Sequence, residues 1–125
     1  MNEPVRYTTH VCLVSAQATP NLTPVIDPAF APRHVVMLVS PAMRSRAEHL
    51  AAVLKRREVT VCFLDVTDPY DYLAIEECLL TWLADHDSDD LALNVTGGTK
   101  VMAMAAQEVF RSAGKPVFYV NIDSD

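Results

Sequence analysis

The chain lacks the excess of basic residues that nucleic-acid-coating proteins carry. Among its 125 residues, 10 are Lys or Arg and 16 are Asp or Glu, which gives a formal net charge of -6. Because binding along DNA or RNA depends on many Lys and Arg contacts to phosphates, this balance argues against such a protein. A small anionic ligand held by a few local groups remains compatible with it.

Long apolar runs are also missing. None approaches the roughly 20 residues that a bilayer requires, and residues 1–9 are polar, without the apolar segment of a secretory signal. We therefore expect a cytoplasmic protein. With 50% hydrophobic residues, the chain has the length and composition of one compact domain, which we expect to span residues 1–125.

Cysteine is scarce, and its spacing is uninformative. Cys12, Cys62 and Cys78 are odd in number, lack a CxxC pair and lie in apolar stretches. This pattern favours buried, reduced thiols over a disulfide frame or a zinc site.

Familiar catalytic patterns are absent as well. The sequence has no HExxH, no GxSxG, no GxxxxGK[ST] and no GxGxxG, so nothing indicates a hydrolase triad, ATP hydrolysis or NAD binding. Asp65, Asp68 and Asp71 suggest a metal site or an acid–base pair, but Asp beside Thr67 and Pro69 more often forms a turn and a helix cap. We expect no metal and no cofactor.

Short apolar runs that alternate with helical patterns define the fold class. Five runs predict strands, at residues 10–15, 34–40, 59–66, 91–95 and 116–122. Apolar residues recur at helical spacing in three segments, at 43–54, 71–85 and 102–110, and Gly114 ends the last of these. This order predicts an α/β, Rossmann-like domain with a five-stranded, mainly parallel sheet and helices on both faces.

One segment departs from the alternation. Residues 16–32 contain four prolines and leave room for at most a short helix near residues 22–26. We expect an ordered loop there.

Residues 94–100 (NVTGGTK) carry the sharpest functional signal. Gly97 and Gly98 are two of only three glycines and lie between a predicted strand and a helix that begins near Thr99. Glycines there allow positive φ and a close approach to a ligand, while the helix N-terminus presents N–H groups to an anion. Thr96 and Thr99 add hydroxyls and Lys100 adds a charge. The alternative is a tight turn in which Thr99 is only the N-cap.

Other small polar residues follow the remaining strands. In open α/β sheets, ligands bind beyond the carboxyl ends of the strands. Gln17, Thr19 and Asn21 suit recognition of a base or ribose, although turn chemistry around Pro20 and capping by Asn21 explain them too. After the next strands, the candidates that line the crevice or merely start a helix or turn are Ser40, Met43, Ser45 and Thr67.

Two motifs resemble the CARF family (CRISPR-associated Rossmann fold). Residues 14–24 (VSAQATPNLTP) are similar to the first loop of the family, and residues 93–103 (LNVTGGTKVMA) are similar to its glycine turn and helix. The resemblance covers nearly the whole chain. It is strongest to the branch that forms the N-terminal half of CRISPR ancillary nucleases with a PD-(D/E)xK effector domain.

The resemblance implies a function and a set of contacts. It implies a homodimer that binds a cyclic oligoadenylate made by a type III CRISPR complex, most often cyclic tetra-adenylate and otherwise cyclic hexa-adenylate, to control an effector in antiviral defence. Direct DNA binding and a membrane partner are not expected. The residues carried over are Gln17, Ala18, Thr19, Pro20 and Asn21 for adenine and ribose, Asn94, Thr96, Gly97, Gly98, Thr99 and Lys100 around the phosphates, and, more loosely, Ser40, Met43, Ser45 and Thr67.

The effector domain is expected to be absent from this chain, which would be either the sensor part of a longer protein or a free-standing CARF protein. Two alternatives to a pure sensor stay open. One is a ring nuclease that opens the ligand by attack of its own 2′-hydroxyl, with Thr99 or Lys100 stabilising the charge of the phosphorane. The other is an unrelated Rossmann-like domain for an ordinary nucleotide, or a transcription-factor sensor without its DNA-binding helices.

Overall fold

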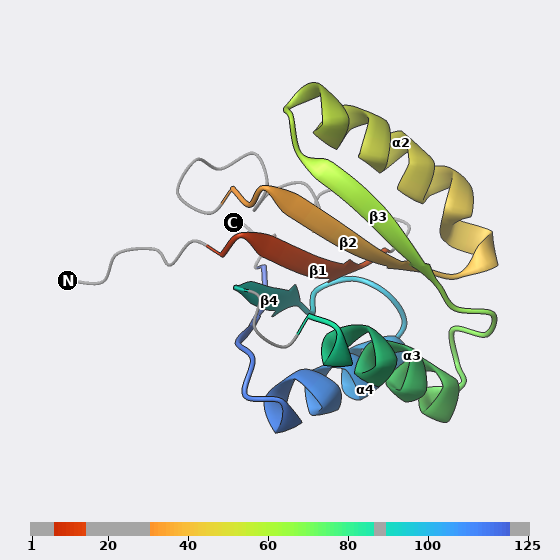
Figure 1. The fold of residues 1–125 in the computed structure, drawn as a ribbon. Helices are drawn as coiled ribbons and strands as arrows, with labels where there is room; N and C mark the ends of the chain where they lie inside the picture. The colour runs from red at the N-terminus through yellow and green to blue at the C-terminus, as the bar shows by residue number, and fades with distance from the viewer. Residues whose placement is uncertain (1–6, 15–30, 87–89, 121–125) are drawn as a thin grey trace, which may run out of the picture.

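A parallel sheet with helices on both faces organises the chain (Figure 1). The computed structural model describes residues 7–14, 31–86 and 90–120. The strands are β1 (Thr9–Leu13), β2 (His34–Val39), β3 (Thr60–Asp65), β4 (Leu91–Asn94) and β5 (Val117–Phe118). The helices are the 3-10 turn η1 (Pro41–Met43), α2 (Arg44–Arg56), α3 (Tyr72–Ala84) and α4 (Lys100–Ser112).

The strand order is β3-β2-β1-β4-β5, and every pair is parallel. This arrangement confirms the predicted α/β fold class. The ordered loop expected at residues 16–32 lies outside the described residues, apart from residues 31 and 32. Within the described part, no helix is long and apolar enough to cross a membrane.

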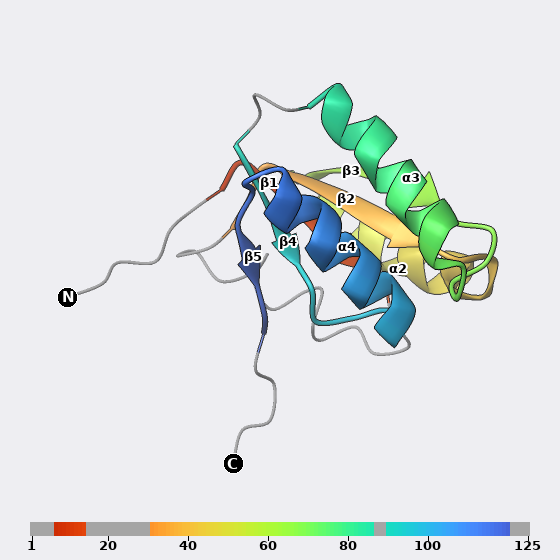
Figure 2. The same ribbon diagram turned by 90° about the horizontal axis from the view of Figure 1, so that it is seen from below.

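The two faces of the sheet have separate cores, because side chains alternate along each strand. Val11 and Leu13 of β1 pack with α3 and α4, whereas Cys12 of β1 and the next residue after the strand, Val14, pack with α2. Figure 1 shows α2 on one face of the sheet, and Figure 2 shows α3 and α4 together on the other. Full burial of a Val or Leu contributes about 1.5–3 kcal/mol, so central strands that are apolar on both sides hold the two helical layers.

Residues at the start of α3 and after the end of α4 support the predicted helix boundaries. Asp71 accepts a hydrogen bond from the Ala74 N–H at 3.1 Å and caps α3, as its position beside Pro69 indicated. Gly114 follows α4 with a φ of 73°, which confirms it as the residue that ends this helix.

Strand β3 is less buried than its sequence indicated. It lies at one edge of the sheet, and its residues are only partly buried or exposed. As a result Cys62 is exposed. Cys78, in α3, is half-buried, and only Cys12 is the buried thiol expected of all three. All three cysteines are free. Apolar content predicted the strand correctly, but it did not reveal that β3 has a neighbour on one side alone.

Candidate functional site

The strand order reverses between β1 and β4, which makes this the switch point of the sheet. The chain runs outward from β1 to β2 and β3, then returns to β4 on the other side of β1. Cys12 pairs with Asn94 in register, so the segments that leave β1 and β4 start side by side at the carboxyl edge. Crevices at such points are where open α/β sheets bind ligands.

The predicted binding loops are the two that leave this switch point. The first contains Gln17, Ala18, Thr19, Pro20 and Asn21, which all lie outside the described residues. The second, residues 94–99, is described and leads directly into α4 (Figure 2).

The start of the second loop is fixed by local hydrogen bonds. Asn94 is buried, and its side-chain Oδ1 accepts from the Thr96 N–H at 3.1 Å. The Thr96 hydroxyl in turn accepts from the Val120 N–H at 2.6 Å, and the Val95 N–H donates to the Phe118 carbonyl at 3.0 Å. The loop is therefore tied both to itself and to the end of β5.

The two glycines of the loop differ in role. Gly98 has a φ of 79°, whereas Gly97 is buried and is not among the described residues with positive φ. A Cβ atom on Gly98 would lie 2.8 Å from the Cβ of Leu13 in β1. Gly98 thus uses the positive φ that glycine allows, and its missing side chain lets the loop pack on the central strand.

Thr99 is the N-cap of α4. Its hydroxyl accepts from the Met102 N–H at 3.0 Å and donates to the Pro69 carbonyl at 2.7 Å. A hydroxyl has a single proton, so in this geometry Thr99 has none left for a phosphate oxygen. The capping interpretation is confirmed, and the ring-nuclease alternative gains no donor from Thr99.

Lys100 is the first residue of α4, where helix stability does not favour it. The side chain is exposed, the first turn contains no acidic residue, and no ion pair of Lys100 occurs within the described residues. A cation near the N-terminus of a helix lies at the positive end of the helix dipole, which is unfavourable by about 0.3–1 kcal/mol. Lys100 and the helix N-terminus together make a position that attracts an anion.

The remaining candidates lie farther along the same edge. Ser40, directly after β2, is buried, and Met43, directly before α2, is half-buried. Ser45 and Thr67 are exposed. Adjacent strands lie about 4.8 Å apart, so the end of β3 is about 14 Å from that of β4. Thr67, which follows β3, therefore reaches a ligand at the switch point only if the ligand is wide, whereas Ser45 follows β2, the direct neighbour of β1.

A hollow of about 610 Å³ lies beside Thr67. Its wall contains Arg44, whose charge is already paired with carboxylates of this chain. Arg44 reaches Asp65 at 2.6 Å and Glu48 at 3.3 Å, and its guanidinium lies 4.3 Å from the ring centroid of Phe63. The carboxylates of Glu48 and Asp65 raise the pKa of Arg44. They also offset its charge, so this hollow is a poorer anion site than the start of α4.

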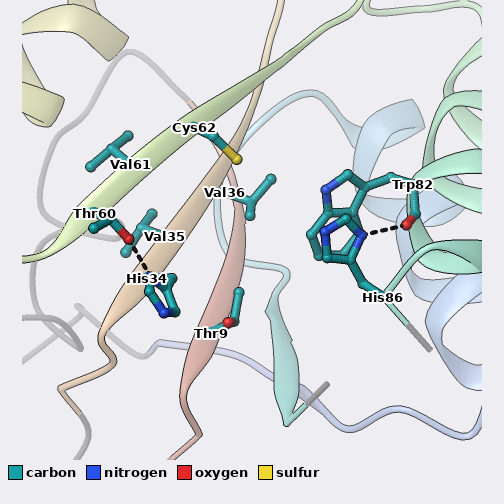
Figure 3. Close-up of a pocket in the computed structure, with 9 residues that line it drawn as sticks. All are labelled: Thr9, His34, Val35, Val36, Thr60, Val61, Cys62, Trp82 and His86. Atoms are coloured by element: carbon teal, nitrogen blue, oxygen red, sulfur yellow. Dashed lines mark hydrogen bonds between the residues drawn. The ribbon is translucent and has the colours of Figure 1, made fainter. Parts of the chain in front are cut away.

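A second hollow, of about 270 Å³, lies at the opposite, amino-terminal edge of the strands (Figure 3). Trp82 and His86 stack in one wall with ring centroids 4.1 Å apart, and the His86 Nδ1 lies 2.8 Å from the Trp82 carbonyl oxygen. His34 and Thr60 are hydrogen-bonded in the other wall. This hollow was not predicted from the sequence. The one local pattern that pointed to it is the spacing of Trp82 and His86 by four residues, which brings the two rings together at the end of α3.

The second hollow offers little chemistry. Cys62 lines it, and partial burial raises the pKa of this thiol, which reduces the thiolate fraction. Within the described residues no cluster of His, Cys, Asp or Glu suits a metal ion. The start of α4 remains the best-equipped site.

A family model described as the Card1 CARF domain matches residues 9–125 of the chain. The chain belongs to this CARF family. No curated protein matches it in sequence. The resemblance seen in residues 14–24 and 93–103 is thereby confirmed at the level of the CARF domain.

Solved structures share the fold of this CARF domain. Can2 from Sulfobacillus thermosulfidooxidans, in complex with cyclic tetra-adenylate, is 32% identical, with a TM-score of 0.82 over 92% of this chain and 31% of Can2. VC1899 from Vibrio cholerae is 23% identical, with a TM-score of 0.87 over 94% of this chain and 31% of that one. A type III CRISPR defence DNA nuclease activated by cyclic oligoadenylate is 24% identical, with a TM-score of 0.78 over 96% of this chain and 19% of the nuclease. The CARF chain spans less than a third of each of these proteins.

Proposed function

We propose that this CARF domain is a sensor of cyclic oligoadenylate, with cyclic tetra-adenylate as its preferred ring. Support comes from its 32% identity to Can2, which was solved with that ligand. The observation in the chain itself that carries the proposal is the set of anion-binding groups at the β1/β4 switch point.

Several hydrogen-bond donors lie on the loop and the first turn of α4 at this switch point. Thr99 caps the Met102 N–H, which leaves the N–H groups of Lys100 and Val101 in the first turn without an acceptor in the described residues. The Lys100 ammonium and the Thr96 hydroxyl lie on the same loop and helix start. A phosphodiester bears one negative charge and two non-bridging oxygens, and these groups are suited to both.

A cyclic ligand made of identical units fits a two-fold assembly. We propose that two copies of the domain contribute one pair of loops each, with residues 17–21 at adenine and ribose and residues 94–100 at the phosphates. Where an effector domain of the PD-(D/E)xK class is attached, binding would shift the dimer between two arrangements and so control it. A ligand achieves this only through unequal affinity for the two arrangements.

Calorimetry with purified chain, cyclic tetra-adenylate and cyclic hexa-adenylate tests the proposal, and chromatography follows the ring for several hours. We expect one intact tetra-adenylate ring per two chains. Ring opening would make the domain an enzyme, and no heat with either ring would refute the proposal.

A matched pair of variants locates the site. Lys100→Ala should weaken binding by about 10-fold or more, because hydrogen bonds to charged groups contribute about 1.5–3 kcal/mol. Lys55→Ala removes an equal charge from the last turn of α2, on the other side of the sheet, and should leave the affinity unchanged. Equal effects of the two variants would remove Lys100 from the site.

A further inference from the structure

The hydroxyl of Thr96 joins the candidate phosphate loop to the chain beyond β5. It accepts a hydrogen bond from the Val120 N–H at 2.6 Å. Val120 lies two residues past the end of β5 and is the last residue that the structure describes. One side chain thus touches both the loop that leads into α4 and the exit of the last strand.

Thr96 still has a donor to offer. A threonine hydroxyl has one proton and two lone pairs, and Val120 occupies one lone pair. Within the described residues no acceptor takes the Thr96 proton. Thr99 differs, because its proton already goes to the Pro69 carbonyl. Of the two threonines in the loop, Thr96 is the one equipped to donate to a phosphate.

Donating that proton would also alter the bond to Val120. When a hydroxyl donates to an anion its oxygen becomes more electron-rich, so it accepts more strongly from a second partner. A phosphate oxygen at Thr96 would therefore tighten the bond from the Val120 N–H. The effect needs no displacement of either residue.

We propose that Thr96 is a relay residue, through which a ligand phosphate holds the segment that follows β5. The proposal rests on the proposed function, since it takes the anionic ligand to be bound at residues 94–100. The relay acts at a short strand, because β5 contains only two residues, Val117 and Phe118, which pair with Leu93 and Asn94 of β4. Linkage is reciprocal, so the Val120 N–H must strengthen ligand binding as much as the ligand strengthens its bond.

Amide hydrogen exchange of Val120, followed by NMR with and without cyclic tetra-adenylate, measures the relay directly. In the free protein, Thr96→Val should speed this exchange roughly 3- to 10-fold, the effect of losing one hydrogen bond, whereas Thr96→Ser keeps the hydroxyl and should behave like the original chain. Adding the ligand should slow Val120 exchange further in the original chain and in Thr96→Ser. It should have no such effect in Thr96→Val, even at a concentration that saturates the variant.

A second pair of variants leaves Thr96 intact. Val120→Pro removes the N–H donor, and Val120→Ala keeps it while shortening the side chain. Val120→Pro should weaken cyclic tetra-adenylate binding about 2- to 5-fold relative to Val120→Ala. In this proposal residue 120 acts through Thr96 and does not itself contact the ligand.

The outcomes separate the relay from the function on which it rests. If the original chain binds the ring but Val120 exchange does not respond, or if Val120→Pro and Val120→Ala bind equally well, the relay is wrong and the sensor proposal stands. If the original chain binds neither ring, both proposals fail.

Discussion

Replacement of Gly98 by Ala tests the packing of the loop of residues 94–99 on the central strand β1. At a φ of 79°, a residue with a side chain costs about 1–2 kcal/mol relative to Gly. The new Cβ would also lie 2.8 Å from the Cβ of Leu13, an atom fixed to the backbone of a fully buried strand residue. Overpacking of this kind costs about 1–3 kcal/mol, so we expect Gly98→Ala to lower the free energy of unfolding by about 2–5 kcal/mol.

Gly114 provides the matched control. Its φ is 73°, nearly that of Gly98, but a Cβ there would meet no atom within 4 Å. Gly114→Ala should therefore cost only the backbone part, about 1–2 kcal/mol.

Urea unfolding followed by circular dichroism measures both variants, provided that the slope with urea stays that of the original chain. Equal destabilisation of Gly98→Ala and Gly114→Ala would refute the argument, because it would mean that the contact with Leu13 contributes nothing.

Three further predictions concern titration, capping and thiol exposure. Burial lowers the pKa of His10 from 6.5 to about 4, so the unfolded chain binds the proton more readily, and stability present above pH 6.5 should fall by roughly 2–3 kcal/mol between pH 6.5 and 4. In His10→Phe this part of the fall should disappear from urea titrations across that range, and an unchanged profile would contradict the assignment. Thr99→Val removes both the cap and the Pro69 contact and should cost about 1–2 kcal/mol in thermal or urea unfolding, whereas Thr99→Ser should cost much less. A thiol reagent at pH 8 should modify Cys62 in the folded chain. Cys12 is buried and its pKa is raised to about 12, so it should react only on unfolding. Mass spectrometry of the peptides shows which cysteine is modified first, and modification of Cys12 before Cys62 would contradict the prediction.

The sequence predicted most of the fold because its signals are local. Apolar runs and helical spacing depend on residues within a few positions of one another, so they located the five strands, the three helices and the turn at residues 94–100. The prediction was weaker where burial depends on a distant neighbour. Strand β3 has four apolar residues of six, against five of six in β2, but it lies at the edge of the sheet, and Cys62 is exposed for that reason.

The sequence by itself indicated the CARF family, the parallel α/β class and the loop that we propose binds phosphate. Only the tertiary structure decided the role of each group in that loop, because each role depends on a contact with a residue far away in the chain. Gly98 is required by Leu13, the proton of Thr99 goes to Pro69, and the hydroxyl of Thr96 receives the N–H of Val120. No local pattern encodes these contacts, because they form only when segments far apart in the sequence pack together in the folded domain.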